Sequence, residues 1–193
     1  LLFSSSSFAY GNHASWSQNR GGMNLPYLFT TQSEVISSQL SIISTDQDAE
    51  QFNQSFSGLG FKTELGTEVF KFARFSTYHL YRDTAANEDE SLRGSEIGGE
   101  IKLSFYGPVL NIQFGLGING SRLLYQNPTD SRYYYGTGYV GSVGFERFLA
   151  SKASVLFTIK GQNETLRPEE SAYKEEVSLS SVGGAFGLIL WLD

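Results

Sequence analysis

The chain contains no cysteine in its 193 residues. This absence excludes disulfides, thiolate metal sites, cysteine nucleophiles and a lipid-modified N-terminal cysteine. The chain also lacks any run that approaches the ~18 consecutive apolar residues required for a transmembrane helix. Strands that cross a membrane are compatible with this second absence, because each strand carries a much weaker hydrophobic signal than a helix does.

Positive charge is scarce and is not clustered along the chain. The formal net charge is −6, and no group of Lys and Arg residues could neutralise a row of phosphates. Nucleic acid is therefore excluded as a partner. Glycine (21 residues), phenylalanine (15) and tyrosine (11) are abundant, whereas only 18% of the residues are charged. This composition favours β structure with closely packed backbones over a helical bundle.

The first 26 residues differ from the rest of the chain. Residues 1–3, a serine run and the letters "SFA" before Tyr10 resemble the end of a secretory signal with a small-residue cleavage site. The alternative is an extended arm or a first strand. We expect residues 1–26 to form a separate N-terminal segment of one of these kinds, and residues 27–193 to form a single domain.

The stretch "NIQFGLGING", residues 111–120, alternates between small polar and bulky apolar residues. Strict alternation predicts a β-strand whose two faces meet different environments. Residues 111–121 are the fifth of eight segments that read as strands. The other seven segments are 35–44, 55–70, 75–82, 95–106, 133–147, 153–162 and 177–192.

The connections between these segments alternate strictly in length. Tiny turns are expected at 71–74, 107–108 and 149–152. Longer, polar and acidic loops are expected at 45–54, 83–94, 122–132 and 163–176. This asymmetry is typical of outer-membrane barrels, which have short periplasmic turns and longer extracellular loops.

The less bulky face of the strands carries Gly, Ser, Asn and Gln with sparse charges of both signs. Such a face suits the interior of a barrel of about eight strands, whose lumen side chains can fill. Charges in that interior must pair, because a lone buried charge costs several kcal/mol. We therefore predict a mixed-charge network that plugs the lumen, with Arg74 as an additional candidate. Its members are Lys62, Glu64, Glu68, Glu96, Glu100, Lys102, Glu146 and Lys160.

The bulky face is predicted to contact lipid. A soluble lipocalin-like barrel or sandwich is the alternative, and it would turn the same faces the other way. The predicted lipid-facing residues are Leu59, Phe61, Leu103, Phe105, Ile112, Phe114, Leu116, Ile118, Val143, Phe145, Phe157, Phe186, Leu188 and Leu190.

Aromatic residues near the strand ends predict two interfacial girdles. The loop-side girdle is expected to contain Tyr78, Tyr81, Tyr125, Tyr133, Tyr134 and Tyr135. The turn-side girdle is expected to contain Phe70, Phe72, Tyr106, Phe148 and Trp191.

On this pattern, and on the final segment "SVGGAFGLILWL", the chain resembles the small eight-stranded outer-membrane barrels of Gram-negative bacteria, the OmpA/OmpX/OmpW-like group. The resemblance covers about residues 27–192 and rests on no specific motif. The last strand of that family usually ends in an aromatic residue, whereas here Leu192 and Asp193 follow Trp191. The resemblance implies an all-β, antiparallel, up-and-down transmembrane barrel in the bacterial outer membrane. Its expected partners are outer-membrane lipid, lipopolysaccharide and another envelope protein.

Catalytic motifs are absent from the sequence: it contains no G-x-S-x-G, H-E-x-x-H, Walker loop or G-x-G-x-x-G. His13 lies in the N-terminal segment, in "NHAS". His79, in "TYHLYR", is expected to be a hydrogen-bonded lumen residue, and it is the candidate general base of a lipid hydrolase. The acidic stretches "DQDAE" and "NEDESL" are candidates for divalent cations, although solvated loops are far commoner.

The sequence therefore predicts a non-enzymatic structural or interaction protein with no cofactor and no bound metal. Its acidic loops or its lipid-facing wall would make the contacts. A narrow channel for ions or small solutes and a lipid-modifying hydrolase are the two alternatives.

Overall fold

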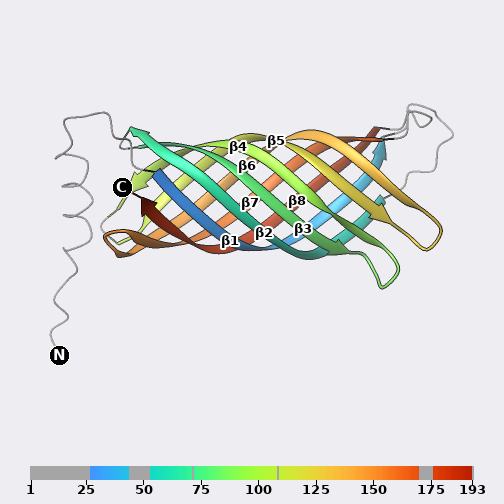
Figure 1. The fold of residues 1–193 in the computed structure, drawn as a ribbon, viewed down its shortest axis with the longest axis horizontal. Coiled ribbons are helices and arrows are strands. Elements are labelled where there is room, and N and C mark those ends of the chain that lie inside the picture. Colours follow the sequence, from blue (N-terminus) through green and yellow to red (C-terminus); the bar gives the residue numbers. More distant parts are fainter. Residues whose placement is uncertain (1–26, 44–52, 71, 108, 170–175, 193) are drawn as a thin grey trace.

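The computed structural model describes residues 27–43, 53–70, 72–107, 109–169 and 176–192. They form eight antiparallel strands that close into a barrel in the order of the chain (Figure 1). Within this part of the chain, no helix is long and apolar enough to cross a membrane. The strands are β1 Tyr27–Ile43, β2 Asn53–Phe70, β3 Ala73–Ala85, β4 Ser91–Tyr106, β5 Asn111–Gln126, β6 Ser131–Ala150, β7 Ala153–Pro168 and β8 Glu176–Leu192.

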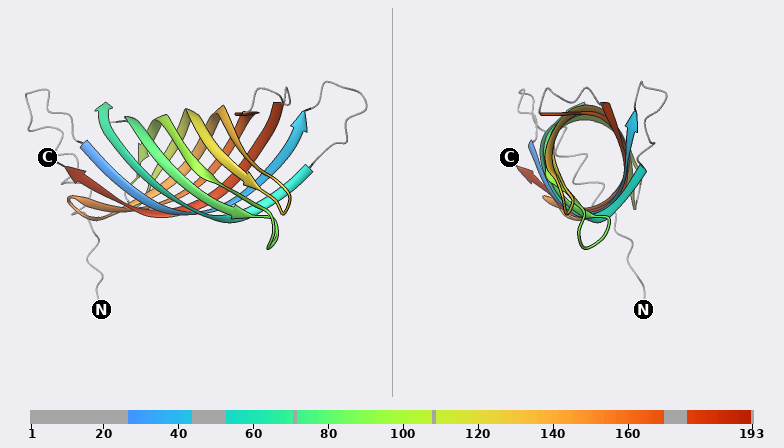
Figure 2. Two further views of the ribbon diagram at one scale, coloured as in Figure 1. Left: turned by 45° about the vertical axis from the view of Figure 1, so that its right-hand side comes forward. Right: turned by 90° about the vertical axis from the view of Figure 1, so that its right-hand side faces the viewer.

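Each strand pairs with its neighbours in the chain, and β1 pairs with β8 to close the ring. Figure 2 shows the strands inclined to the barrel axis, and its end-on view shows the closed ring. The register shifts at Glu68/Phe70 and at Phe148/Ala150, next to two of the short turns. A shift of this kind bends a strand and ends its pairing. Because the ring is closed, the described barrel has no sheet edge with unpaired backbone N–H and C=O groups. Such unpaired groups are not tolerated in the hydrocarbon interior of a membrane.

The connections at one end of the barrel have two to four residues and those at the other end four to nine, so the predicted difference between the ends is present, but it is not strict: 107–110 is as long as 127–130 (Figure 1). Residues 71–72, 107–110 and 151–152 connect strands at one end, which we call the turn end. Residues 44–52, 86–90, 127–130 and 169–175 connect strands at the other end, which we call the loop end.

The strands extend further toward the loop end than the sequence indicates. The loops predicted at 83–94 and 122–132 shorten to 86–90 and 127–130, because β3, β4, β5 and β6 continue as paired hairpins. The first strand begins at Tyr27, and not at Val35 as the pattern indicates.

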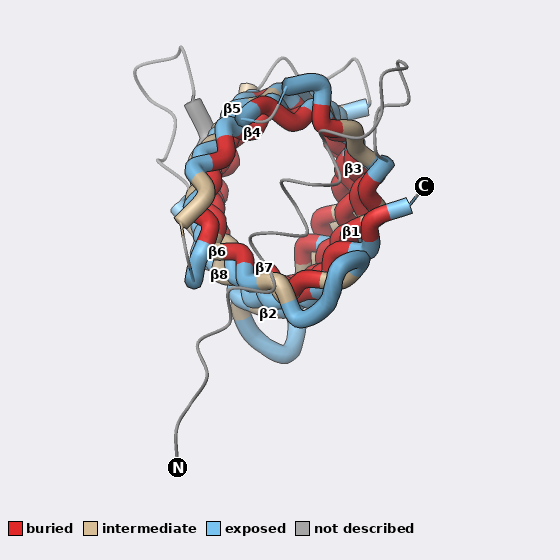
Figure 3. Tube along the Cα trace, turned by 90° about the vertical axis from the view of Figure 1, so that its left-hand side faces the viewer, coloured by how far each residue is buried: buried red, intermediate tan, exposed pale blue. Residues whose placement is uncertain are grey.

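Buried and exposed positions alternate along every strand, and the buried positions face the lumen (Figure 3). Twelve of the fourteen predicted lipid-facing side chains are exposed on the outer wall. The other two, Val143 and Phe145, are half-buried, and the Phe145 ring stacks against Phe157. Soluble monomers rarely expose apolar patches beyond a few hundred Å², so a continuous apolar wall of this kind indicates a lipid environment.

The two faces exchange their character near the loop end. On β5, the outward side chains change from Leu116 and Ile118 to Arg122, while the inward ones change from Asn119 to Leu123. We call the loop-end part of the barrel, where polar side chains face out and apolar ones face in, the collar. Its buried interior consists of Leu40, Phe56, Leu92, Leu123, Tyr125, Tyr134, Leu166, Val177 and Leu179. The collar therefore has the polarity of a soluble protein, whereas the wall below it has the reverse.

Candidate functional site: the filled lumen

Side chains fill the lumen in three successive layers. The turn end holds an apolar layer of Leu28, Leu156, Ile189 and Trp191, with Phe148 packed against it. The loop end holds the apolar interior of the collar. Between them lies a polar layer with twelve buried charged side chains, of which seven are glutamates and five are lysines or arginines. Neutral side chains also donate hydrogen bonds to glutamates of this layer, among them Glu68, Glu96, Glu146 and Glu164.

Arg74 organises the part of the polar layer nearest the turn end. Its guanidinium lies 3.0 Å from a carboxylate oxygen of Glu146 and 3.5 Å from one of Glu68. The same guanidinium lies over the ring of Trp191, 4.7 Å from its centroid, and so joins the charges to the apolar layer. Neutral side chains that donate to these two glutamates are Tyr106, Gln113 and Ser154.

Two lysines and two glutamates form a compact cluster in the middle of the lumen. Lys62 Nζ lies 2.8 Å from Glu100 and 3.2 Å from Glu64. Lys102 Nζ lies 2.5 Å from Glu64 and 3.4 Å from Glu100. Each ammonium group therefore contacts both carboxylates, and the cluster carries no net charge. It connects β2 to β4 across the intervening β3, a link that backbone pairing does not make.

Arg82 organises the part of the polar layer nearest the collar. It lies 2.5 Å from Glu96 and 3.6 Å from Glu164, and it is 1% exposed. Lys160 lies 3.8 Å from both Glu34 and Glu96. Neutral side chains that donate to Glu96 or Glu164 are Tyr78, Asn119, Ser121 and Gln162. This group joins β1, β3, β4, β5 and β7, so it ties together strands from around the whole ring.

A small cavity adjoins the polar layer among the described residues. A cavity of about 10 Å³ lies between the polar layer and the turn-end layer, next to Glu64, Arg74 and Lys102. That volume holds at most one water molecule. Small residues make the dense filling possible: a Cβ added at Gly98 would lie 2.5 Å from the Tyr78 ring, whose hydroxyl donates to Glu96.

All eight charges that the sequence singled out are buried inside the barrel. Lys62, Glu64, Glu100 and Lys102 are brought into direct contact with one another. Glu68 and Glu146 meet only through Arg74, and Glu96 and Lys160 belong to the group around Arg82.

Sequence reasoning missed three members of the polar layer, Glu34, Arg82 and Glu164. Glu34 precedes the first predicted strand, and Glu164 lies in a segment read as a loop. On β3 the inward and outward positions were assigned one residue out of phase, so Arg82 was not placed in the lumen. The alternation of Phe75 with Ser76, continued along β3, would have turned Arg82 inward.

The phase error on β3 also reverses the expected positions of its neighbours. His79, predicted to face the lumen, is exposed on the outer wall together with Thr77, whereas Tyr78 is buried in the lumen. A one-residue shift moves every side chain of a strand to the other face. Both faces of β3 mix aromatic and polar residues, so its composition does not distinguish them.

The predicted girdles are correct only in part. Tyr125, Tyr134 and Trp191 are buried in the lumen, and Tyr106 donates a hydrogen bond to Glu68 there. These aromatic rings fill the apolar layers or support the charges, and so they do not face the membrane interface. The girdle residues that are exposed on the outside are Phe70, Phe72, Tyr81, Tyr133 and Tyr135.

Of the two acidic stretches proposed as cation sites, only "NEDESL" lies among the described residues; "DQDAE" lies outside them. In "NEDESL", the Asn87 side-chain oxygen accepts from the backbone N–H groups of Asp89 and Glu90, which closes a tight turn. Glu90 also accepts from Gln54. Among the described residues, no group of three or more potential ligands is placed to hold a metal ion.

No family model matches the chain, and no curated protein matches it. Among solved structures, Neisserial surface protein A (NspA) is similar over 84% of this chain and 96% of its own, with 11% identity and a TM-score of 0.63. The outer-membrane protein AlkL is similar over 91% of this chain and 94% of its own, with 10% identity and a TM-score of 0.57. The outer-membrane protease OmpT from Escherichia coli covers 88% of this chain and 97% of its own, with 7% identity and a TM-score of 0.43.

The likeness to NspA and AlkL shows the fold. The chain is an eight-stranded, antiparallel, up-and-down barrel of the type found in the outer membranes of Gram-negative bacteria. Its apolar outer wall and polar interior agree with that type. The expected fold class and the expected resemblance are both confirmed.

Proposed function

We propose that the protein is a non-enzymatic outer-membrane barrel that acts through its outer surface, as a structural or interaction protein. The filled lumen carries this proposal. Two apolar layers enclose a polar layer whose charges are paired within the barrel. The interior of a barrel of about eight strands is narrow enough for its own side chains to fill, and the cavity beside Glu64, Arg74 and Lys102 holds at most one water.

Among the described residues, the surface available for contacts consists of the outer wall, the outside of the collar and two loops. The described loops 86–90 and 127–130 are short, and the first is closed on itself by Asn87. These two loops therefore contribute less surface than the sequence indicates. In the described part of the chain, contacts with lipid or with another envelope protein would be made mainly by strand surface.

Conductance distinguishes this proposal from a narrow channel. In planar lipid bilayers, we expect the purified protein to produce no stable openings. The Arg82→Leu variant should also stay closed, because the apolar layers on both sides of the polar layer remain in place. Stable openings of the wild-type protein, above those of a protein-free detergent control, would overturn the closed-barrel proposal and support the channel.

Lipid analysis addresses the hydrolase alternative. His79 is exposed on the outer wall, pairs across the sheet with Thr63 and Ile97, and makes no side-chain hydrogen bond with any described residue. We therefore expect His79→Ala and the wild type to give the same lipid A and phospholipid species by mass spectrometry after expression in the same host. A deacylated species that depends on His79 would show enzymatic activity instead.

A further inference from the structure

The outer wall changes from apolar to polar at a similar level on neighbouring strands. On β4 the change follows Ile97, with Ser95 and Arg93 beyond it. On β5 it follows Ile118, with Arg122 as the next outward residue that has a side chain. The end of an apolar band marks the edge of the hydrocarbon layer, and aromatic residues gather there. Side chains just beyond this level lie among lipid headgroups.

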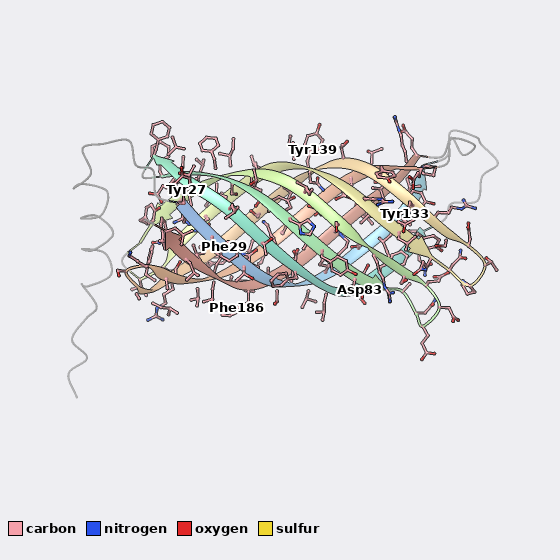
Figure 4. The ribbon with its side chains drawn as sticks, in the orientation of Figure 1. Tyr27, Phe29, Asp83, Tyr133, Tyr139 and Phe186 are labelled. Atoms are coloured by element: carbon pink, nitrogen blue, oxygen red, sulfur yellow. The ribbon has the colours of Figure 1, made fainter. Side chains whose placement is uncertain are left out.

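Arg122 is an exposed cation at this level. Its guanidinium carbon lies 4.5 Å from the ring centroid of Tyr133 and 5.5 Å from that of Tyr135. Tyr133 is exposed on the outer wall and lies toward the loop end (Figure 4). Arg122 forms no ion pair with any described residue, although ion pairs hold three other arginines near the loop end. Those pairs are Arg93–Asp83, Arg132–Asp130 and Arg167–Glu176. The aromatic rings therefore orient a charge that no carboxylate of the described barrel neutralises.

Arg93 lies beside Arg122 on the same face. Ser95 pairs directly with Arg122, and Arg93 pairs directly with Leu124, so the two arginines are diagonal neighbours on β4 and β5. Diagonal neighbours are about 7–8 Å apart, within reach of long side chains. The Arg93–Asp83 pair is about half exposed, so little energy opposes a new partner for Arg93. The Arg122 guanidinium lies toward β6 and that of Arg93 toward Asp83 on β3, so the two reach one phosphate when Arg93 leaves Asp83 and turns toward β5. The planar donors of a guanidinium are suited to a phosphate.

An apolar groove lies on the outer wall on the membrane side of Arg122, and its nearest lining residue on β5 is Ile118, the next outward side chain after Arg122. It has a volume of about 1090 Å³ and runs across the outer wall from β5 to β1. Gly99 gives it depth, because a Cβ there would have only the Ser76 carbonyl within 4 Å, at 3.6 Å. Gly120 separates Arg122 from the groove and has no side chain to obstruct the path. Exposed apolar residues that line the groove include Leu65, Phe75, Ile101, Leu116 and Ile118.

We propose that Arg122 and Arg93 bind a phosphate of lipid A, and that one acyl chain of the same molecule lies in the groove. The loop end of such barrels faces the cell exterior, where lipid A with its phosphorylated sugars forms the outer leaflet. Along the outer wall, the arginine, the aromatic rings and the groove occupy the levels of the lipid headgroup, the membrane interface and the hydrocarbon, respectively. This inference rests on the outer-membrane setting of the proposed function and adds the residues and the groove that would hold the lipid.

The test compares lipids that differ in one group. The full chain is reconstituted in phosphatidylcholine nanodiscs, and binding is titrated with lipid A, with its bis-dephosphorylated form, and with phosphatidylglycerol. We expect lipid A to bind best, and Arg122→Gln to weaken its binding about tenfold, as for loss of one charge-assisted hydrogen bond. The matched control is Arg147→Gln, which removes an exposed arginine from the turn end of the same wall. It should change binding less than twofold.

A second variant tests the groove separately from the charge. Gly99→Leu places a side chain in the open space of the groove and leaves both arginines in place, so lipid A should bind more weakly while still preferring the phosphorylated form. Heat-modifiability on a gel verifies that each variant is folded. Equal binding of dephosphorylated lipid A or of phosphatidylglycerol, or unchanged binding by Arg122→Gln, would overturn the lipid A site. Displacement of bound lipid A by millimolar inorganic phosphate would identify an unspecific anion site instead. None of these outcomes alters the conductance result on which the closed-barrel proposal depends.

Discussion

Replacing Arg82 with leucine should lower the free energy of unfolding by about 3–5 kcal/mol, the usual effect of removing one partner from a buried ion pair. Glu96 would lose its contact at 2.5 Å and Glu164 its contact at 3.6 Å. Lys160, 3.8 Å from Glu96, would be the remaining cation close to Glu96. Urea titration of the protein folded in lipid vesicles, followed by tryptophan fluorescence, measures the change.

Arg93→Leu is the matched control for this experiment. It removes an arginine from an ion pair between the same two strands, β3 and β4, but the side chains of Arg93 and Asp83 are 51% and 50% exposed. Exposed pairs contribute at most about 1 kcal/mol, so this variant should remain close to the wild type. If the two variants were equally stable, Arg82 could not be the centre of a buried network.

Truncating Phe56 to alanine should destabilise the protein by about 3–5 kcal/mol, as expected for a large ring removed from a packed core. Phe56 is 1% exposed, and its ring meets the ring of Tyr125 edge to face at 6.2 Å. The same urea titration measures the loss. The effect arises because the collar is held together by an apolar interior, and not by lipid.

Phe72→Ala controls for the loss of a phenylalanine as such. Phe72 lies at the turn end and is 59% exposed, with its ring stacked on that of Phe70. Its truncation should cost much less than that of Phe56. A small effect at Phe56 would mean that the interior of the collar is not packed, and that the loop end of the lumen is open.

The eight strands and their order could be predicted because alternation is a local signal with a period of two residues. The inward charges of β2, β4 and β6 could be predicted for the same reason. Local signals failed in the collar, where apolar residues face the lumen and polar residues face out, the reverse of the membrane-spanning wall. Segments such as 122–126 therefore do not continue the pattern of a membrane strand and are read as loops. They also failed on β3, where Tyr78 and His79 could each occupy either face.

The pairing of charges could not be obtained from sequence because it depends on the closure of the ring. Arg82 and Glu164 are 82 residues apart in the chain, and Lys160 meets Glu34 across the junction that β8 completes. The register between strands decides which of the inward-facing charged side chains lie close enough to form ion pairs with one another. Arg122 had no special signal at all, because its importance comes from the lack of a carboxylate neighbour.

The ion pairs near the loop end bear on how the chain could be inserted. Asp83–Arg93 lies within the β3–β4 hairpin, Asp130–Arg132 within the β5–β6 hairpin, and Arg167–Glu176 within the β7–β8 hairpin. Hairpin tips must travel through the whole bilayer to reach the far side, and an arginine exposed to lipid at the midplane costs about 2–4 kcal/mol. A hairpin that crossed with its strands already paired would carry its own counter-charge through the hydrocarbon. Its barrier to translocation would then be lower than that of an unpaired arginine.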